Sequence, residues 1–415
     1  MKIINDITKY LEGKKVLILG FGREGKATYN FIKKYIPALE IGIADFDEID
    51  INEVTFCGKD YLKSIYNYDV VIKSPGIPYK DLDLTGFNGV ITSQTDLLLK
   101  FNRNNIIGIT GTKGKSTTSS LIFNILKKGN VNVKLIGNIG VPPFECLEEF
   151  DDDINLVYEM SSHQLENVTN SPHIAILLNI FEEHLDHYNS YEDYQLAKVN
   201  IFRWQNNNDY LICNKSNELV KKYVEEFCNS KNIEIIDNWE EYGNLLGEHN
   251  KLNVKIAVSV AKLFNIEDDV IKSAIAEFKS LPHRLEYVGE FNGIKYYNDS
   301  IATVPQATIA AVESIKELDT LIIGGMDRGI NYNDFIEYLN NSEIKNIILA
   351  YETGIKIANK LKRSGIYLVK DLEEAVSVAK RVTEKVCLLS PAAASYGYFK
   401  NFEERGNYFK ELVQQ

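Results

Sequence analysis

One short segment limits what this chain can fold into more than any other: Gly108-Ile-Thr-Gly-Thr-Lys-Gly-Lys-Ser-Thr117. An apolar run ending at Ile109 precedes its glycines, and residues 117–126 follow with the apolar spacing of a helix. A strand, a glycine-rich loop and a helix N-terminus in this order aim backbone N–H groups and the positive end of the helix dipole at an anion. The segment therefore predicts a phosphate-binding loop in an α/β domain, and we interpret it as an ATP site.

The predicted ATP loop is shorter than the common P-loop, which has glycine five residues before its Gly-Lys pair, where this chain has Ile109. In such loops a lysine at the helix start reaches the β- and γ-phosphates, and the next hydroxyl ligates Mg²⁺. A glycine-rich turn without a ligand is the alternative. The loop residues predicted to bind ATP are Gly111, Thr112, Lys113, Gly114, Lys115, Ser116 and Thr117.

Composition and charge argue against several classes of protein. A net charge of −12 disfavours non-specific nucleic-acid binding, which needs a basic surface. No apolar run approaches the roughly 18 residues that a membrane span needs, and lysines interrupt the N-terminus where a secretory signal would be apolar. The five cysteines are scattered without a CxxC pair, so neither structural zinc nor a disulfide framework is expected. We expect a cytoplasmic protein.

Residues 1–97 have the pattern of a Rossmann-type nucleotide-binding domain. A predicted strand leads into Gly20-x-Gly22-x-x-Gly25, and a second strand ends at Asp45, about 20 residues after the loop. This fingerprint is a weak signal by itself, because NAD is only one of the nucleotides that it accommodates. A further strand that begins at Asp69 ends in a Ser74-Pro75-Gly76 turn, at the carboxyl edge where such sheets bind ligands.

Two more α/β domains are predicted from alternating strands and helices. The central domain covers residues 98–280, with strands expected at 105–110, 156–159, 174–179 and 209–214. The C-terminal domain covers residues 281–415, with strands expected at 321–324, 346–350 and 386–390. The segment 280–286 between them is expected to act as a hinge. The predicted fold class is therefore α/β with three domains: a Rossmann-type domain, a P-loop ATPase domain and a Rossmann-like domain.

Carboxylate and imidazole side chains follow two predicted strands of the central domain. Glu159 ends one strand, and His184 and Asp186 lie just past another. Mg²⁺ prefers carboxylate and phosphate oxygens and tolerates a single histidine. A lone His184 would more often be a hydrogen-bonded loop residue, but a phosphate loop in the same domain favours the metal role. Lys198 lies in a helical run, where a single lysine is ordinarily a solvated charge.

Other polar groups also follow apolar runs or share a helix face. Asn250 and Asn253 are three residues apart, so both amides can meet a flat base edge. Arg284 stands near the domain junction, and its forked guanidinium suits an anion. Three polar loops of the C-terminal domain, around Asp299, Arg328 and Ser395, each follow a predicted strand. They indicate a ligand face, and a set of capping turns is the alternative.

Taken in order, these motifs resemble the Mur ligase family of ATP-dependent amide-bond ligases over essentially the whole chain. The shortened phosphate loop is the usual form in that family, and the Rossmann-type first domain is similar to the branches that bind UDP there. The motifs that carry the resemblance are Thr110-Gly-Thr-Lys-Gly-Lys-Ser116, Glu159-Met-Ser-Ser-His-Gln-Leu-Glu166, His184-Leu-Asp186, Leu281-Pro-His-Arg284, Asn298-Asp-Ser300, Leu389-Ser-Pro-Ala-Ala-Ala-Ser395 and Lys400-Asn-Phe-Glu-Glu-Arg-Gly406.

The resemblance is strongest to the branch that adds D-glutamate to UDP-N-acetylmuramoyl-L-alanine in peptidoglycan precursor synthesis, using ATP and an acyl-phosphate. It implies a monomer with small-molecule partners only: that UDP substrate, glutamate and ATP. It also implies two Mg²⁺ ions, held by Ser116, Glu159, His184 and a carbamylated Lys198, with Lys115, Glu159, His184 and Lys198 as catalytic residues. Further ATP contacts would be Asn250, Asn253, Arg284 and Asp299. The UDP substrate would meet Gly22, Arg23, Glu24, Gly25, Asp45, Ser74, Pro75, Gly76, Asn138 and Gln164, and the amino acid would meet Thr303, Arg328, Ser395 and Phe402.

One departure bears on the identity of the amino acid. That branch commonly has lysine after the Asn-Asp-Ser triplet, where this chain has Ile301, whereas Arg328 replaces another lysine and keeps a cation. A related ligase that adds L-glutamate or another amino acid therefore stays open. A folylpolyglutamate-synthase-like enzyme is disfavoured, because it lacks a UDP-binding Rossmann domain. A non-enzymatic NAD or redox-sensing module built on the Gly20–Gly25 loop is the most distant alternative.

Overall fold

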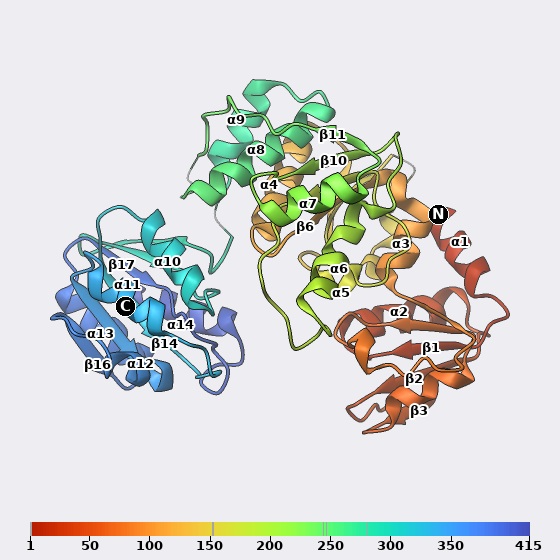
Figure 1. The fold of residues 1–415 in the computed structure, drawn as a ribbon, viewed down its shortest axis with the longest axis horizontal. Helices are drawn as coiled ribbons and strands as arrows, with labels where there is room; N and C mark the ends of the chain where they lie inside the picture. Colours follow the sequence, from red (N-terminus) through yellow and green to blue (C-terminus); the bar gives the residue numbers. More distant parts are fainter. Residues whose placement is uncertain (1, 152, 244, 246, 280) are drawn as a thin grey trace. The chain divides into compact units, whose positions relative to one another are not determined.

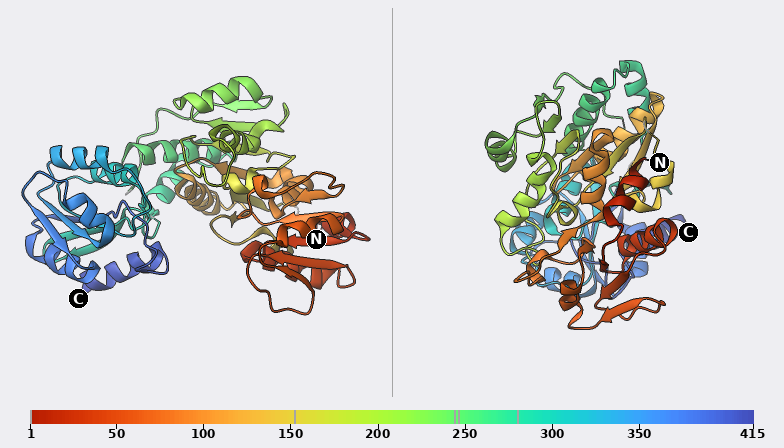
Figure 2. Two further views of the ribbon diagram at one scale, coloured as in Figure 1. Left: turned by 60° about the horizontal axis from the view of Figure 1, so that its bottom comes forward. Right: turned by 90° about the vertical axis from the view of Figure 1, so that its right-hand side faces the viewer.

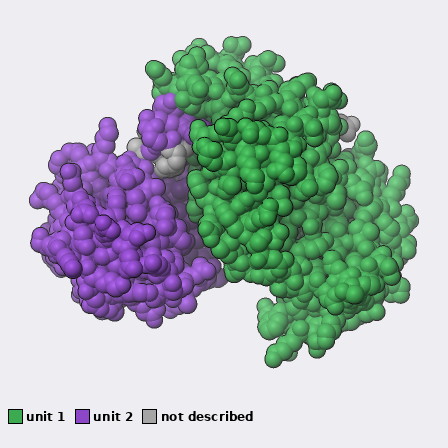
Figure 3. Space-filling view, in the orientation of Figure 1, with its two compact units in different colours: residues 1–241, 253–275 green, residues 242–252, 276–415 purple. Residues whose placement is uncertain are grey.

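The computed structural model describes residues 2–151, 153–243, 245, 247–279 and 281–415. Within these residues the chain forms three sheets and separates into two compact units. Unit 1 contains residues 1–241 and 253–275, and unit 2 contains residues 242–252 and 276–415 (Figure 3). Position 280, where the predicted hinge begins and the predicted central domain ends, lies outside the described residues. The mixed α/β architecture confirms the predicted fold class.

The N-terminal part of unit 1 forms a sheet of five parallel strands (Figure 1). Its elements are α1 Lys2–Leu11, β1 Val16–Leu19, α2 Arg23–Tyr35, β2 Ile41–Asp45, β3 Val54–Cys57, η1 Tyr61–Asn67, β4 Val70–Lys73, η2 Tyr79–Asp81, β5 Val90–Thr92 and α3 Gln94–Asn102. The strand order β3-β2-β1-β4-β5 reverses direction between β1 and β4. At such a switch point the loops after both strands diverge and leave room for a ligand. The glycine loop follows β1 and the Ser74-Pro75-Gly76 turn follows β4, so the fold brings these two predicted loops together.

The second sheet of unit 1 has six parallel strands in the order β11-β10-β9-β6-β8-β7. The elements of this part are η3 Arg103–Asn105, β6 Ile106–Thr110, α4 Lys115–Lys128, β7 Val133–Gly137, η4 Pro143–Glu145, η5 Leu147–Glu149, β8 Asn155–Glu159, α5 Ser162–Leu165, β9 Ile174–Leu177, α6 Tyr191–Arg203, β10 Tyr210–Cys213, α7 Glu218–Phe227, β11 Lys231–Ile233, α8 Glu248–Leu263 and α9 Asp268–Glu277. α4 packs against β6, β7 and β8, and α6 packs against β6 and β9. The phosphate loop follows β6, Glu159 is the last residue of β8, and the loop after β9 carries His184. These segments lie at the same edge of the sheet, because β6, β8 and β9 are parallel neighbours. The strand expected at 174–179 ends at Leu177, because Asn179 turns to bind the phosphate loop.

The two sheets of unit 1 share one apolar core. This core combines Val16 and Ile18 of the first sheet with Leu156 and Tyr158 of the second. Phe31 of α2 and Phe144 of η4 meet across the two parts, with ring centroids 4.8 Å apart. The first sheet and the phosphate-loop sheet therefore form one compact body. The predicted domain boundary at residues 97 and 98 stays a prediction.

Unit 2 contains a six-stranded sheet in the order β12-β13-β17-β14-β15-β16, parallel except for the β12–β13 hairpin. Its elements are β12 Glu286–Phe291, β13 Ile294–Asn298, α10 Pro305–Ser314, β14 Leu318–Gly324, α11 Asn333–Asn341, β15 Asn346–Ala350, α12 Tyr351–Ala358, β16 Ile366–Val369, α13 Leu372–Val382, β17 Val386–Leu389 and α14 Phe402–Gln414. Strand residues enter two separate cores. Residues of α10, α11 and α12 belong to one core, and residues of α13 and α14 belong to the other. Figure 2 gives two further views of these elements. Among the described residues, no helix has both the length and the apolar composition needed to cross a membrane.

Candidate active site

The predicted phosphate loop connects β6 to α4, which begins at Lys115. Gly114 has a φ of 90°, and a Cβ there would lie 2.8 Å from Asn253 Oδ1, so both its backbone conformation and the available space require glycine. The Thr112 N–H donates to the Asn179 carbonyl at 3.0 Å. The Asn179 side chain accepts from the Lys113 N–H at 2.8 Å and donates to the Lys113 carbonyl at 3.0 Å. The residues after β9 therefore fix the shape of the phosphate loop.

Two lysines converge on one carbonyl of this loop. Lys115 Nζ donates to the Gly111 and Thr112 carbonyls at 2.8 and 3.0 Å, and Lys198 Nζ donates to the Gly111 carbonyl at 3.0 Å. Lys198, on α6, is only 2% exposed. Burial, and then the charge of Lys115, hold the pKa of Lys198 well below its ordinary value. The burial of Lys198 thus excludes the solvated helix charge that a lone lysine usually is.

Tyr194 is a site residue that the sequence prediction lacks. It lies one helical turn before Lys198 on α6, and Lys198 Nζ is 4.9 Å from the centre of its ring. The Tyr194 hydroxyl is 2.8 Å from Thr112 Oγ1, which also accepts from the Phe181 N–H at 2.9 Å. Tyr194 therefore ties α6 to the phosphate loop. Its i, i+4 spacing from Lys198 is the signal that could have identified it.

Glu159 ends β8, beside β6, and its side chain is fully buried. Asn138 Nδ2 donates to Glu159 Oε1 at 2.8 Å, whereas Oε2 has no hydrogen-bond partner among the described residues. An unpartnered buried carboxylate oxygen is costly, and a hard cation would satisfy it. In the described part of the chain, no group of three or more His, Cys, Asp and Glu residues could hold a metal ion. A cation at Glu159 would need further ligands of another kind, such as phosphate oxygens or the Ser116 hydroxyl.

His184 lies in the exposed loop after β9, with a φ of 59°. Its ring packs edge-on against His163, with centroids 4.9 Å apart, and His163 stacks on His187 at 3.8 Å. His187 is buried, with Nε2 3.3 Å from Glu166 Oε2. Burial, followed by the charge of His187, lowers the pKa of His163 to about 3, so this ring is neutral near pH 7. His163 and His187 are not among the predicted site residues. The ring of His163 contacts the ring of His184 and stacks on that of His187.

The two loops at the switch point of the first sheet contact each other directly. The Ser74 hydroxyl donates to the Gly20 carbonyl at 2.8 Å, and a Cβ on Gly20 would lie 2.7 Å from Ser74 Cβ. A Cβ on Gly25, in the first turn of α2, would lie 2.0 Å from the Gly20 carbonyl oxygen, so this position requires glycine. Asp45 Oδ2 accepts from the Phe21 N–H at 2.5 Å, so the predicted ribose-binding carboxylate also holds the glycine loop. Pro75 is half-buried and Gly76 is exposed beside it.

Residues predicted to bind the UDP substrate connect the first sheet to the central sheet. Arg23 Nη2 donates to the Gly140 carbonyl at 2.9 Å, and Gln164 Nε2 donates to Glu24 Oε1 at 2.8 Å. Asn138, two residues before Gly140, holds Glu159 as described above. Hydrogen bonds thus link the start of α2 to the segments that carry Asn138 and Gln164, and Asn138 binds Glu159.

One predicted residue of unit 2, Asp299, is a buried carboxylate. Asp299 is 5% exposed, and its two oxygens accept from the Leu285 N–H at 3.2 Å and from the Ser390 hydroxyl at 2.9 Å. Burial raises the pKa of Asp299 to about 7, against the opposing effects of these hydrogen bonds and of the Arg284 charge. Thr303 and Phe402 are half-buried, Arg328 is exposed and Ser395 is buried. Of the two predicted amides on α8, Asn253 belongs to unit 1 and Asn250 to unit 2.

Arg405 joins three of the motifs in unit 2; it lies in the Lys400–Gly406 motif but is not among the predicted site residues. It is 1% exposed, and its Nε and Nη2 donate to the Ser300 hydroxyl at 3.0 Å and to the Ser300 carbonyl at 2.8 Å. Its Nη1 donates to the Ala393 carbonyl at 3.1 Å. The Ser300 hydroxyl donates in turn to the Phe402 carbonyl at 2.8 Å. One buried guanidinium therefore holds the Asn-Asp-Ser loop, the Ser-Pro-Ala loop and the start of α14 together.

Replacing Asp299 by Asn should stabilise unit 2 at pH 8 and much less at pH 5. The raised pKa means that the folded state favours the protonated carboxyl, so the stability it contributes is present below about pH 4 and is lost as the pH rises through about 7. A shift of this size corresponds to a destabilisation on the order of 2–4 kcal/mol at pH 8, which Asn avoids. Thermal unfolding at both pH values measures the gain.

Asp327→Asn is the matched control for that experiment. A hydrogen bond from Lys356 lowers the pKa of Asp327, so removing its charge should not stabilise the protein at pH 8. Equal unfolding temperatures for the wild type and Asp299→Asn at pH 8 would contradict the buried-charge interpretation.

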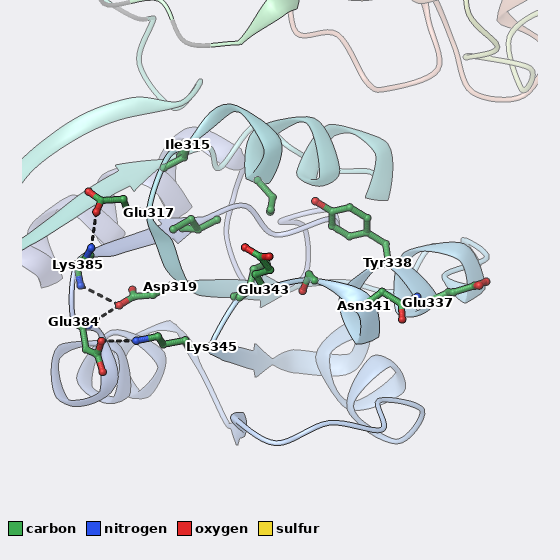
Figure 4. A pocket seen from close by; sticks show the side chains of 14 residues that line it. Ile315, Glu317, Asp319, Glu337, Tyr338, Asn341, Glu343, Lys345, Glu384 and Lys385 are labelled. Carbon is green, nitrogen blue, oxygen red and sulfur yellow. Dashed lines mark hydrogen bonds and ion pairs between the residues drawn. The ribbon is translucent and has the colours of Figure 1, made fainter.

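A cavity of about 690 Å³ opens beside α10 and α11, at the amino ends of β14, β15 and β17 (Figure 4). Most of the charges around it are paired. Glu317 meets Lys385 and Glu384 meets Lys345, each at 2.5 Å, and Asp319 accepts from backbone N–H groups of Glu384 and Lys385. The predicted site residues of unit 2 follow the carboxyl ends of the strands. The cavity is therefore at the opposite edge of the sheet and does not belong to the predicted site.

Comparisons with known proteins identify the family of this chain. The Mur ligase middle domain matches residues 109–275, and the Mur ligase glutamate ligase domain matches residues 283–393. The UDP-N-acetylmuramoylalanine–D-glutamate ligase of Clostridioides difficile is 34% identical over 447 residues, covering 97% of this chain and 99% of the relative. The ligase of the same name from Acetivibrio thermocellus is 34% identical over 463 residues, covering 99% and 98%.

Solved structures share the fold. The crystal structure of the UDP-N-acetylmuramate-alanine ligase MurC from Thermotoga maritima matches with a TM-score of 0.59 at 18% identity, covering 97% of this chain and 99% of that one. MurF from Thermotoga maritima, solved in complex with ADP, matches with a TM-score of 0.60 at 17% identity, covering 98% and 96%. The family resemblance seen in the motifs is thereby confirmed. The chain belongs to the Mur ligase family, the ATP-dependent ligases that form amide bonds in peptidoglycan synthesis.

Proposed function

We propose that this protein joins D-glutamate to UDP-N-acetylmuramoyl-L-alanine and converts ATP to ADP and phosphate. The observation that carries the proposal is the similarity, over nearly the full length, to ligases named for this reaction. The hydrogen bonds in unit 1 that link α2 to the segments of Asn138 and Gln164, and Asn138 to Glu159, support it. We assign UDP-substrate binding to residues 1–97, ATP binding to 98–280 and amino-acid binding to 281–415. We also propose that the protein is a cytoplasmic monomer.

The proposed reaction has two displacement steps. The alanyl carboxylate of the UDP substrate forms a bond to the γ-phosphorus as the bond to the ADP oxygen breaks, which gives an acyl-phosphate and ADP. The amine of glutamate then bonds to the acyl carbon, phosphate leaves and the amine loses a proton. The protein's task is to align the reactants and to offset charge at the transferring phosphoryl group. Lys115, at the start of α4, is suited to that charge, and Asn138 and Gln164 are suited to hold the alanyl arm.

The residues present fit Mg²⁺. Glu159 offers a buried carboxylate oxygen without a partner, and Ser116 offers a hydroxyl in the first turn of α4. His184 would supply a nitrogen ligand for a second ion. Bound Mg²⁺ would offset the negative charge of the phosphoryl oxygens. Asn138 orients the Glu159 carboxylate, since it donates to the other oxygen.

Lys198 fits a carbamate. An unprotonated lysine amine can attack the carbon of CO₂ and lose a proton, giving an N-carboxylate anion, and the lowered pKa of Lys198 shifts its equilibrium toward the unprotonated form. An ammonium at this position would repel nearby metal ions, whereas an anion would favour them. Lys115 Nζ and Lys198 Nζ both bind the Gly111 carbonyl, and this proximity supports the presence of an anion between the two lysine side chains.

The test of the proposed function is a coupled assay of ADP formation. ADP should form only when the UDP substrate and D-glutamate are both present, and mass spectrometry should find the UDP substrate extended by one glutamyl residue. Faster ligation of L-glutamate would replace the stereochemical assignment and keep the ligase assignment. No ADP formation with any amino acid would overturn the proposal.

Ile301→Lys should improve the KM for D-glutamate by roughly ten- to a hundredfold, provided that the longer side chain reaches a substrate carboxylate. Ile301 is half-buried, two residues before Thr303, and cannot donate a hydrogen bond. A hydrogen bond to a charged group contributes about 1.5–3 kcal/mol, which corresponds to that gain. Steady-state kinetics measure it, with Ile301→Met as the uncharged control of similar length. An equal KM for the Lys and Met variants would show that no carboxylate lies near this position.

A further inference from the structure

A lysine of the first sheet reaches into the loop that carries His184. Lys80 lies in η2, four residues after Gly76 of the Ser-Pro-Gly turn, and its side chain is exposed. Its Nζ donates to the carbonyl of Asp186 and lies 3.4 Å from the carbonyl of Tyr188. One cation therefore joins two carbonyls just past His184, from a segment more than 100 residues earlier in the chain.

A second set of contacts runs from the same segment to the same loop. Lys73, the last residue of β4, is 5% exposed, and its Nζ is 3.7 Å from Glu166 Oε2. The same carboxylate oxygen is 3.3 Å from His187 Nε2. The His187 N–H donates to the His184 carbonyl at 3.0 Å. Residues 73–80 thus contact the loop directly through Lys80, and Lys73 is linked to His187 only through the Glu166 carboxylate.

Beyond these contacts, the loop is held at Phe181 by Thr112, at Glu183 by Lys113 and at His184 by the ring of His163. Residues 181–186 have no regular secondary structure, and Phe181, His184, Leu185 and Asp186 are exposed. His184 also has a positive φ of 59°, a conformation that a histidine adopts at some cost and that its surroundings must maintain. A segment with few buried contacts opens easily, and a displacement of about 1 Å at a catalytic group can lower a rate substantially.

We propose that Lys80 is a positioning residue: by binding the Asp186 and Tyr188 carbonyls, it holds the His184 loop in the conformation required for catalysis. The inference rests on the proposed function, because the role of His184 is assigned there. It gives the first sheet a second task beside UDP-substrate binding. The Ser-Pro-Gly turn and Lys80 belong to one short segment, so a substrate that orders the turn also orders the His184 loop.

The first test needs neither metal nor substrate. Lys80→Met keeps the length and apolar stem of the side chain and removes the donor. Hydrogen–deuterium exchange of a peptide covering residues 181–190 should become faster by at least about threefold, as expected when a hydrogen bond from a charged donor is lost. Lys80→Arg should restore slow exchange, since a guanidinium can donate to both carbonyls. Lys59→Met removes an exposed lysine of the same sheet and should leave this peptide unchanged.

The second test separates positioning from substrate binding. Lys80→Met should lower kcat by roughly tenfold or more and raise the Mg²⁺ concentration needed for half-maximal rate, with little change in KM for the UDP substrate. Lys80→Arg should recover most of kcat. Unchanged exchange and unchanged kcat in Lys80→Met would overturn the proposal, and so would an effect confined to KM for the UDP substrate. A wild-type enzyme without ligase activity would refute the proposed function. The exchange experiment would still show whether Lys80 holds the His184 loop.

Discussion

Lys115→Ala is expected to lower the rate of ADP formation by roughly 10²–10³-fold and to leave the affinity for the UDP substrate nearly unchanged. Lys115 begins α4, so in the proposed ATP complex its ammonium and the N-terminal amides of that helix would bind the same phosphates. Removing one preorganised donor from a transition state that develops charge typically costs about 3–4 kcal/mol. Steady-state kcat and calorimetric binding of the UDP substrate measure the two quantities.

Lys113→Ala is the matched control. Lys113 lies in the same loop, but its Nζ is exposed and pairs with Glu183 at 2.8 Å, so its loss should have a much smaller effect. Near-normal ligation by Lys115→Ala would refute the assignment of the phosphate site.

Lys115 also influences Lys198, and the two effects can be separated. Its charge helps to depress the pKa of Lys198, so Lys115→Ala should raise that pKa and leave less neutral amine to react with CO₂. High bicarbonate should therefore restore a small part of the lost activity if carbamylation is impaired. The larger, unrestored part would measure the direct action of Lys115 on the phosphates.

Much of the candidate site follows from local sequence signals. Glycines, prolines and polar residues at the ends of apolar runs mark the carboxyl edge of a parallel sheet, and the structure brings the phosphate loop, Glu159 and the loop bearing His184 to one such edge. The glycine loop and the Ser74-Pro75-Gly76 turn meet for the same reason. These predictions need only strand positions and the rule that ligands bind where the strand order reverses.

The elements missing from the prediction divide into two kinds. β12 and β13 carry a usable sequence signal, the Asn292-Gly293 pair between them, which is typical of a hairpin turn. In the structure both residues have the positive φ values that such a turn requires, 53° and 80°. The short edge strands β3 and β11 carry none, since their exposed and half-buried residues show no clear alternation. Their place in the sheet depends on the neighbouring strand.

Contacts between distant segments could not be predicted from a single sequence. From the sequence alone, Lys80 is indistinguishable from an ordinary surface lysine, and only the fold brings it to the Asp186 carbonyl. Arg405 goes against the rule that arginine stays near solvent: it is buried without a carboxylate and is satisfied by carbonyl and hydroxyl oxygens. The lowered pKa of Lys198 likewise arises from burial by α6 and the phosphate loop together.

Lys198→Ala is expected to reduce activity by at least about 10²-fold, and short carboxylic acids should restore part of it. The substitution removes a buried side chain and leaves a space beside the Gly111 carbonyl and Lys115. A small carboxylate can enter this space and replace the carbamate, because both are planar anions with two oxygens. Acetate and propionate should therefore raise kcat in a saturable way, whereas chloride at equal ionic strength should not.

The choice of rescuing agent decides what Lys198 supplies. If it acted as a cation, methylammonium would restore activity and acetate would not, and Lys198→Arg would retain function. If it acts as a carbamate, Lys198→Arg should be as inactive as Lys198→Ala, because a guanidinium does not react with CO₂ and would repel Mg²⁺. Thermal unfolding of all three proteins shows whether the loss is local. Rescue by carboxylates and not by amines, in variants that remain folded, would establish that the buried lysine of α6 contributes negative charge to the site.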